Sequence, residues 1–236
     1  MPTGRYPWSF GSKRGGLAWF DGGVRGALGY RDRQHAGQVL AELVRDRVGT
    51  VDLVLGLPRG GVPVAAEVAS ATGAELDVLV VRKIGVPGHE ELAMGALASG
   101  GLRVLNDEVV RDVGVDEATV EARTEVARRE LERRAAHLRG DRPPPVIAGR
   151  VVVVVDDGLA TGATMRAALE ALRAEEPRQL VGAVPVGAPS TCAALAAIAD
   201  DFVCAQQPER FGAVGRWYDD FSATTDDEVV ALLARR

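Results

Sequence analysis

The sequence predicts an α/β fold, a single domain in which helices flank a mainly parallel, twisted sheet. Short runs of Val, Leu and Ala alternate with segments of helical periodicity along most of the chain. Only 5% of the 236 residues are aromatic although 47% are hydrophobic, so small aliphatic side chains must build the core. Continuous aliphatic runs of this kind are typical of strands that are buried on both faces of a parallel sheet.

Composition divides the chain into three parts. Residues 1–31 are rich in Gly and basic residues and lack periodicity, which predicts an irregular N-terminal arm. Strand and helix patterns fill residues 32–205, the predicted core. Residues 206–236 hold an aromatic tail and then a helical pattern that begins at Asp226.

The first half of the predicted core begins with a helix and continues as a βαβ unit. Val39, Leu40, Leu43 and Val44 recur at helical spacing before a short apolar strand, and Gly73 is a stop signal after the second helix. The βαβ order predicts two parallel strands. The predicted elements are a helix over 36–48, a strand over 51–57, a helix over 62–71 and a strand over 76–81.

The second half contains a loop, a long helix and a buried strand. Residues 82–91 are polar and carry two glycines and a proline, which predicts a long mobile loop. Asp116 is the predicted N-cap of a charged helix over 117–139, and five consecutive valines at 151–155 predict a central strand. The remaining predicted elements are strands over 102–105, 180–186 and 202–205, and helices over 165–174 and 190–198.

Charge and apolar pattern argue against several classes of partner. The formal net charge of −5 disfavours a nucleic-acid partner, because a phosphate backbone requires a basic face. No apolar stretch reaches the ~20 residues of a membrane span, and the N-terminus lacks the apolar run of a signal peptide. We therefore expect a cytoplasmic protein that binds neither nucleic acid nor membrane. Cys192 and Cys204 have no metal-binding spacing and are expected to be buried free thiols.

The loop after the five valines carries the strongest functional signal. Two carboxylates, Asp156 and Asp157, follow the strand directly, and small residues with two threonines lead into a helix. Backbone N–H groups and a helix N-terminus can hold a phosphate, whereas carboxylates accept hydrogen bonds from hydroxyl groups. A ribose 5-phosphate presents both kinds of group. The candidate phosphate-binding residues are Gly158, Leu159, Ala160, Thr161, Gly162, Ala163 and Thr164.

The string VVVVVDDGLATGAT resembles the signature with which type I phosphoribosyltransferases bind 5-phosphoribosyl 1-diphosphate (PRPP). The resemblance implies that Asp156 and Asp157 bind the ribose hydroxyls and that residues 158–164 hold the 5-phosphate. It also implies the type I phosphoribosyltransferase fold, with a small hood built from residues 1–31 and 206–236. The patterns GxxxxGK[ST] and GxGxxG are absent from this loop, which argues against a Walker A or a Rossmann site.

A second segment, GLPRGGVP, is similar to the diphosphate-binding loop of the family. The candidate residues are Pro58, Arg59, Gly60 and Gly61. Glycines let backbone N–H groups approach an anion closely, and an arginine can bind two oxygens at once. Family members often have a non-proline cis peptide bond in this loop.

A basic pair, Arg82 and Lys83, is expected to end the next strand at the same edge of the sheet. The resemblance places this pair in the flexible catalytic loop of the family, which closes over the diphosphate. Together with Asp156 and Asp157, the pair forms the predicted catalytic set.

The resemblance implies a reaction at ribose C1, in which a nitrogen nucleophile replaces diphosphate. Mg²⁺ is the implied cofactor, bound mainly through the substrate, with Asp156 and Asp157 as candidate protein ligands. Family members that use 6-oxopurines have an aspartate where this chain has Ala160, so the acceptor base stays unidentified. The chain is most similar to a bacterial group of unassigned acceptor, and the family implies a homodimer.

One alternative remains open, a regulatory protein that senses PRPP without catalysis. The retained PRGG and VRK elements favour catalysis, since a sensor could lose them. The chain also has no spare length for a DNA-binding domain. Asp32 and Arg33, which precede the first helix, are expected near the site but have no assignable role.

Overall fold

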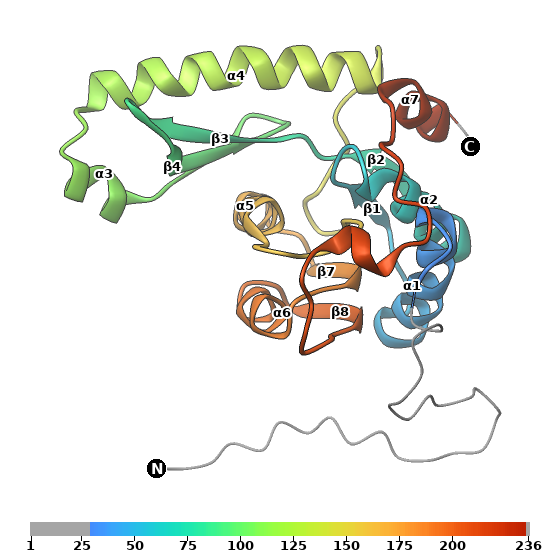
Figure 1. The fold of residues 1–236 in the computed structure, drawn as a ribbon. Coiled ribbons are helices and arrows are strands. Elements are labelled where there is room, and N and C mark those ends of the chain that lie inside the picture. The colour runs from blue at the N-terminus through green and yellow to red at the C-terminus, as the bar shows by residue number, and fades with distance from the viewer. Residues whose placement is uncertain (1–28, 235–236) are drawn as a thin grey trace.

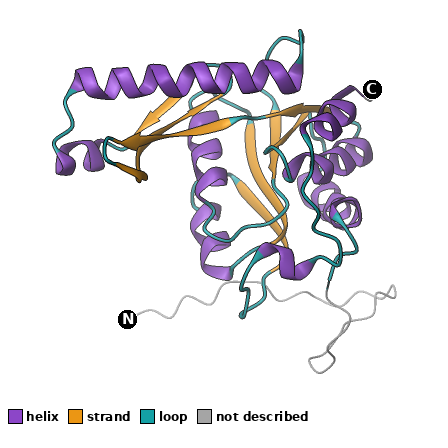
Figure 2. Ribbon diagram, turned by 45° about the horizontal axis from the view of Figure 1, so that its top comes forward, coloured by secondary structure: helices purple, strands orange, loops and turns teal. Residues whose placement is uncertain are grey.

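The computed structural model describes residues 29–234, so the predicted N-terminal arm lies outside the described residues except for its last three. An α/β body carries a five-stranded sheet, and a smaller sheet with a long helix projects from it (Figure 1). Figure 2 shows the protruding sheet and helix from a second direction. We call the projecting part, residues 81–139, the insert.

The five strands of the larger sheet are all parallel, in the order β2-β1-β6-β7-β8. The predicted α/β fold with a mainly parallel sheet is therefore confirmed. Gly56 pairs with Val155, so β1 and β6 end side by side at the carboxyl edge. The strands are β1 (Leu53–Gly56), β2 (Glu75–Val78), β6 (Val151–Val155), β7 (Gln179–Val186) and β8 (Asp201–Gln206).

The valines of β6 explain why helices cover both faces of this sheet. Val153 and Val155 belong to a core cluster with α1 and α2, whereas Val152 and Val154 belong to a cluster with α5 and α6. Successive strand residues point to opposite faces, so an all-valine strand is apolar on both. The covering helices are α1 (Arg33–Val48), α2 (Gly61–Thr72), α5 (Ala163–Arg173) and α6 (Pro189–Ala196).

The insert is an antiparallel three-stranded sheet with a long helix packed on it. The helix has its predicted bounds, and the side chain of Asp116 accepts a hydrogen bond from the Thr119 N–H as the predicted N-cap. A short helix before it was not predicted. The elements are β3 (Val81–Val86), β4 (His89–Ala98), β5 (Leu102–Leu105), α3 (Asp107–Val113) and α4 (Glu117–Arg139).

The prediction that residues 82–91 form a loop is wrong, whereas their mobility stays a prediction. This segment forms β3, a turn at Pro87 and Gly88, and the beginning of β4. Ile84 and Val86 are buried in the cluster that includes the apolar stripe of α4. A register irregularity between them hides the strand pattern, so the glycines and the proline were the stronger local signal.

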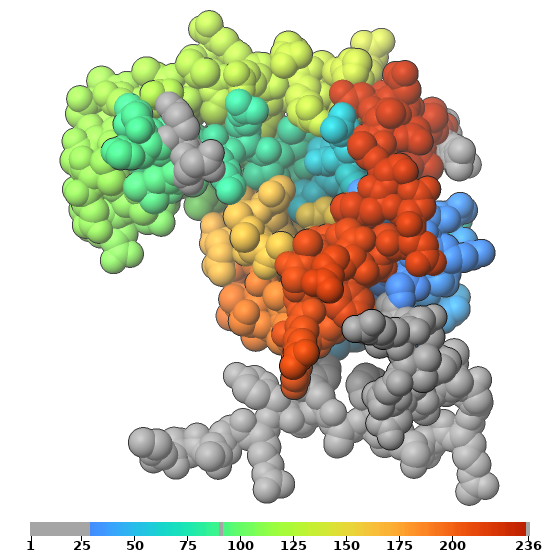
Figure 3. All heavy atoms as spheres, in the orientation of Figure 1, coloured from blue at the N-terminus to red at the C-terminus, as the bar shows by residue number. Residues whose placement is uncertain are grey.

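The C-terminal tail returns to the body and ends in α7 (Asp226–Ala234). Tyr30 and Tyr218 form an isolated parallel bridge, so the residues before α1 and the tail lie side by side. Both rings pack with Phe211 in a buried cluster, next to the 3-10 helix η1 (Val214–Trp217). Figure 3 shows the tail, in red and orange, spread over the surface beside the blue α1.

Two further expectations concern the membrane and the cysteines. No helix within residues 29–234 combines the length and the apolar character needed to cross a membrane. Cys192 and Cys204 are free thiols, as expected, although only Cys192 is fully buried, and their Sγ atoms lie 3.3 Å apart.

Candidate functional site

Two loops meet at the carboxyl edge of the main sheet because the strands before them are neighbours. Residues 57–61 follow β1, and residues 156–162 follow β6. The Leu57 N–H donates a hydrogen bond to the Val155 carbonyl at 2.9 Å, and a Cβ added to Gly61 would lie 2.6 Å from the same oxygen. The structure thus brings the two predicted anion-binding loops together.

The two aspartates of the second loop lie in a poorly solvated position. Burial, followed by the charge of Asp157, raises the pKa of Asp156 to about 8. Burial also raises the pKa of Asp157, although the hydrogen bond from Arg33 acts in the opposite direction. One arginine therefore does not balance the charge of two carboxylates, and the edge favours an additional cation.

Gly60 of the first loop packs directly on Asp157. A Cβ at this position would lie 2.0 Å from Asp157 Oδ2 and 3.1 Å from Arg33 Nε. A side chain at this position would have to displace the Asp157 carboxylate, so the contact between the loops favours glycine. The peptide bond between Pro58 and Arg59 is cis, as it often is in the family that the loop resembles.

The predicted phosphate loop ends at a helix N-terminus and has exposed residues beside it. Gly162 has a φ of 70° and is the N-cap of α5, whose first turn leaves backbone N–H groups without partners inside the helix. This left-handed conformation favours glycine. Ala160, Thr161 and Thr164 are exposed, so the two hydroxyl groups can also reach a ligand. The arrangement fits a phosphate group on a helix N-terminus.

Residues from β7 and α6 support this loop from behind. Leu159 forms an isolated bridge with Gly187, and its N–H donates to the Val186 carbonyl at 2.9 Å. The Thr191 hydroxyl donates to the Ala160 carbonyl at 2.8 Å. These contacts hold the loop backbone in place beside the N-terminus of α5.

Arg59 is available to an anion at the same edge. Its side chain is 48% exposed, and its nearest carboxylate contact is long, 3.9 Å from Nη1 to Asp226 Oδ1 at the start of α7. Arg134 and His137 of α4 lie 3.6 Å from the same carboxylate group. A ligand diphosphate can therefore compete for Arg59 at little cost.

The expected placement of Arg82 and Lys83 is wrong. The pair does not end a strand of the main sheet, because β2 ends at Val78 and the chain then enters the insert. Both side chains are exposed on β3, and Arg82 forms an ion pair with Glu130 of α4. The structure therefore brings Asp156 and Asp157 together with the Arg59 loop but holds the basic pair on a separate sheet.

Two residues contact Asp157 that sequence reasoning did not assign to it. Arg33 Nε donates to Asp157 Oδ2 at 2.8 Å, and the Tyr218 hydroxyl donates to the Asp157 carbonyl at 2.6 Å. Asp32 has a different role, since it caps α1 by accepting from the His35 N–H at 2.7 Å. Arg33 and Tyr218 are 124 and 61 residues from Asp157, so no local pattern could pair them.

The donor set fits Mg²⁺ that a substrate helps to bind. Among the side chains that the structure describes, no three acidic, His or Cys residues are grouped so that they could hold a metal. Asp156 and Asp157 supply hard oxygen donors, and their raised pKa values indicate that a further cation would stabilise the ionised carboxylates, which suits Mg²⁺. Such an ion would need substrate oxygens and water to complete its coordination.

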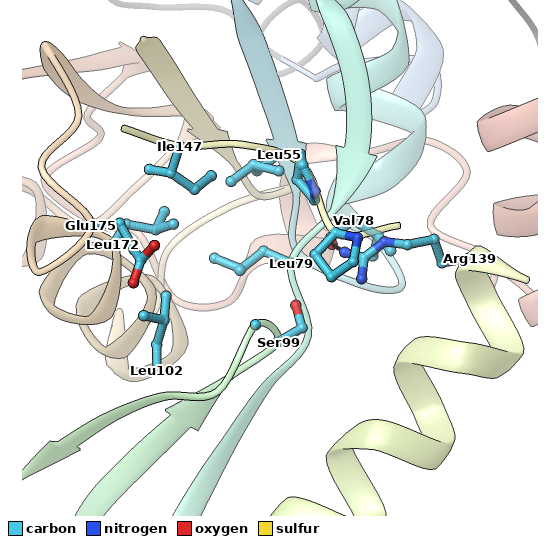
Figure 4. Close-up of a pocket in the computed structure, with 12 residues that line it drawn as sticks. Leu55, Val78, Leu79, Ser99, Leu102, Arg139, Ile147, Leu172 and Glu175 are labelled. Atoms are coloured by element: carbon cyan, nitrogen blue, oxygen red, sulfur yellow. Dashed lines mark hydrogen bonds between the residues drawn. The ribbon is translucent and has the colours of Figure 1, made fainter. Parts of the chain in front are cut away.

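A cavity of about 150 Å³ lies between the body and the insert, away from these loops (Figure 4). Aliphatic side chains such as Leu55, Leu79, Ile147 and Leu172 form most of its wall. Arg139 lies on one side. None of the predicted site residues lines this cavity, so it is separate from the candidate site.

Comparison with known proteins identifies a family over most of the chain. Residues 30–213 match the model of the phosphoribosyl transferase domain. The chain is 49% identical over 206 residues to "Putative phosphoribosyl transferase Rv0571c" of Mycobacterium tuberculosis (strain ATCC 25618 / H37Rv). The same figures hold for "Putative phosphoribosyl transferase MT0597" of strain CDC 1551 / Oshkosh. The match covers 87% of this chain and 46% of each relative, so the chain spans less than half the length of these relatives.

One solved structure is similar to this chain over most of both chains. The crystal structure of TT1426 from Thermus thermophilus has a TM-score of 0.79 and 46% sequence identity. The match covers 86% of this chain and 97% of that one. The chain therefore belongs to the phosphoribosyl transferase domain family.

Proposed function

We propose that this chain binds PRPP at the carboxyl edge of its main sheet and transfers the phosphoribosyl group to a nitrogen nucleophile. The observation that carries the proposal is the contact between the two loops. Two poorly solvated carboxylates lie beside a phosphate-binding helix N-terminus, and the Arg59 loop packs on one of them. PRPP has a diol, a 5-phosphate and a diphosphate, and this edge has groups that suit each of them.

Each group has a proposed task in the reaction. Asp156 and Asp157 accept hydrogen bonds from the ribose hydroxyls, and the backbone and threonines of residues 158–164 hold the 5-phosphate. Pro58, Gly60 and Gly61 shape the loop from which Arg59 binds the diphosphate. Fixing both ends of PRPP exposes C1 to an incoming nucleophile, and binding the leaving diphosphate lowers the barrier to C1–O cleavage.

Mg²⁺ is part of this proposal, held by PRPP oxygens with Asp156 and Asp157 as protein ligands. When bound, it would supply positive charge that stabilises the departing diphosphate. Arg82 and Lys83 keep a proposed catalytic role, in which the insert moves its exposed β3 toward the diphosphate. The acceptor base is open, since Ala160 offers no acid to a purine. A homodimer, a cytoplasmic location and the lack of a nucleic-acid partner stay predictions.

Binding of PRPP tests the donor half of the proposal. We expect PRPP with Mg²⁺ to raise the melting temperature, and the double substitution Asp156→Asn and Asp157→Asn to abolish this rise. The double substitution Glu175→Gln and Glu176→Gln is the control, because it removes two adjacent acidic charges that are exposed and lie away from the proposed site. An equal rise in the Asn variant would contradict the assignment of the ribose hydroxyls.

Release of diphosphate tests the transfer half. Incubation with PRPP, Mg²⁺ and a panel of bases and amines should release diphosphate with one acceptor only. PRPP binding without acceptor-dependent release across a broad panel would instead favour a PRPP-sensing regulatory protein.

A further inference from the structure

Arg33 connects α1 with the Asp157 carboxylate and with the C-terminal tail. Its Nε donates to Asp157 Oδ2 at 2.8 Å, and its Nη1 donates to the Ser222 carbonyl at 2.6 Å. The guanidinium carbon also lies 4.0 Å from the centre of the Phe221 ring. One side chain therefore contacts two consecutive residues of the tail and the loop over residues 156–162, which we call the PRPP loop.

The tail reaches the same aspartate by a second route. The Tyr218 hydroxyl donates to the Asp157 carbonyl at 2.6 Å. The Tyr218 ring packs with those of Tyr30 and Phe221, at centroid distances of 5.5 and 5.0 Å. Asp157 is thus bound through its carboxylate by Arg33 and through its backbone by the tail.

The loop over residues 57–61, which we call the diphosphate loop, also packs against Arg33 and Asp157. The Cβ position of Gly60 is 2.0 Å from Asp157 Oδ2 and 3.1 Å from Arg33 Nε. The side chains of Arg33 and Asp157 are only 12% and 15% exposed. A displaced Arg33 would therefore disturb the carboxylate, the diphosphate loop and the tail together.

An arginine is suited to this position for a geometric reason. Its guanidinium is planar, donates in several fixed directions and stacks on aromatic rings. A lysine has the same charge but presents one compact ammonium on a flexible stem. Lysine can therefore satisfy the Asp157 carboxylate, but it cannot also bind the Ser222 carbonyl and stack on Phe221.

We propose that Arg33 is a positioning residue for PRPP, which orients the Asp157 carboxylate toward the ribose and holds the tail over residues 217–222 against the PRPP loop. This inference rests on the proposed function. It assigns a role to a residue outside both phosphate-binding loops, and it makes the order of the tail depend on the same side chain as PRPP affinity.

The test compares Arg33→Gln, Arg33→Lys and the control Arg31→Gln, which removes an exposed charge two residues away. PRPP affinity is measured by calorimetric titration with Mg²⁺, and order of the tail by hydrogen–deuterium exchange of peptides covering 216–224. Arg33→Gln should weaken PRPP binding by about tenfold or more, as expected for loss of a hydrogen bond between charged groups. It should also raise deuterium uptake of the tail in the ligand-free protein.

The lysine variant separates positioning from general structural support. Arg33→Lys should restore most of the PRPP affinity but not the protection of the tail, and Arg31→Gln should behave like wild type. Wild-type PRPP affinity in Arg33→Gln would overturn the inference. So would equal losses of affinity in the Gln and Lys variants with a general fall in melting temperature.

Failure of the proposed function would look different. Wild-type protein would then show no PRPP binding before any substitution is made. The ligand-free exchange experiment still decides the tail contact in that case, because unchanged uptake in Arg33→Gln would overturn it.

Discussion

An ion pair of the body and one of the insert differ in how far water reaches them. In the body, Arg33 and Asp157 pair with 12% and 15% of their side chains exposed, beside a second carboxylate. In the insert, Arg82 and Glu130 pair with 54% and 43% exposed. Water screens the second pair, whereas the first lies where charge is costly and must be balanced. Of these two pairs, the one at the edge where a ligand is proposed to bind is therefore the one whose partners depend more on each other.

The largest effect is expected from a substitution that forces a methyl group against the Asp157 carboxylate. Gly60→Ala puts a methyl group at a point 2.0 Å from Oδ2 and must move the carboxylate or the loop. We expect PRPP affinity to fall on the order of 100-fold, since displacements near ~1 Å have effects of that size at functional sites. Calorimetric titration measures the change.

Gly29→Ala is the matched control for this substitution, because the nearest atom to its Cβ position is at 3.6 Å. It should leave PRPP affinity unchanged. Equal affinity in Gly60→Ala and wild type would mean that the two loops do not act as one site.

A second prediction uses the raised pKa of Asp156. Its pKa is raised to about 8 in the folded protein, whereas an unfolded aspartate has a pKa of about 3.9. The folded state therefore binds the extra proton between these values, and stability is lost as the pH rises from about 4 through about 8. Asp156→Asn removes this titration.

We expect the melting temperature of ligand-free wild-type protein to fall further between pH 5 and pH 8 than that of Asp156→Asn. A difference of several degrees is expected, because about 1 kcal/mol corresponds to about 2–4 °C in a chain of this size. Thermal unfolding across the pH range measures it. Parallel curves for the two proteins would contradict the raised pKa.

A smaller effect is expected behind the phosphate loop. Thr191→Val removes the hydroxyl that donates to the Ala160 carbonyl while keeping the shape of the side chain. PRPP affinity should fall by about threefold to tenfold, the value of one neutral hydrogen bond. Thr191→Ser keeps the hydroxyl and should bind PRPP like wild type. A similar loss in both variants would assign the effect to packing.

The smallest effect is expected in the insert. Glu130→Gln removes the ion-pair partner of Arg82 on an exposed face of α4. The melting temperature should change by less than about 2 °C, because exposed pairs contribute about 0–1 kcal/mol. Thermal unfolding at one pH is sufficient. A large decrease would show that this exposed pair stabilises the insert more than its solvation implies.

The same two regions also differed in how far the sequence predicted them. Strands of the body are buried on both faces, so they read as continuous apolar runs such as residues 151–155, and glycine-rich loops mark their ends. In the insert, β3 is broken by a register irregularity, and the two glycines and the proline of residues 82–91 resembled a loop. Arg33 and Tyr218 stayed unassigned because only the folded chain brings them to Asp157.

The lack of room for a Cβ atom at Gly60 has a consequence for how this site can vary between related chains. Although they are far apart in sequence, positions 60 and 157 share one small volume, since Asp157 Oδ2 occupies the place of the absent Cβ. A relative with a larger residue at the first position must have a shorter or reoriented side chain at the second. The two positions are therefore expected to covary, and in a variant library randomised at position 60 alone the active variants should retain glycine.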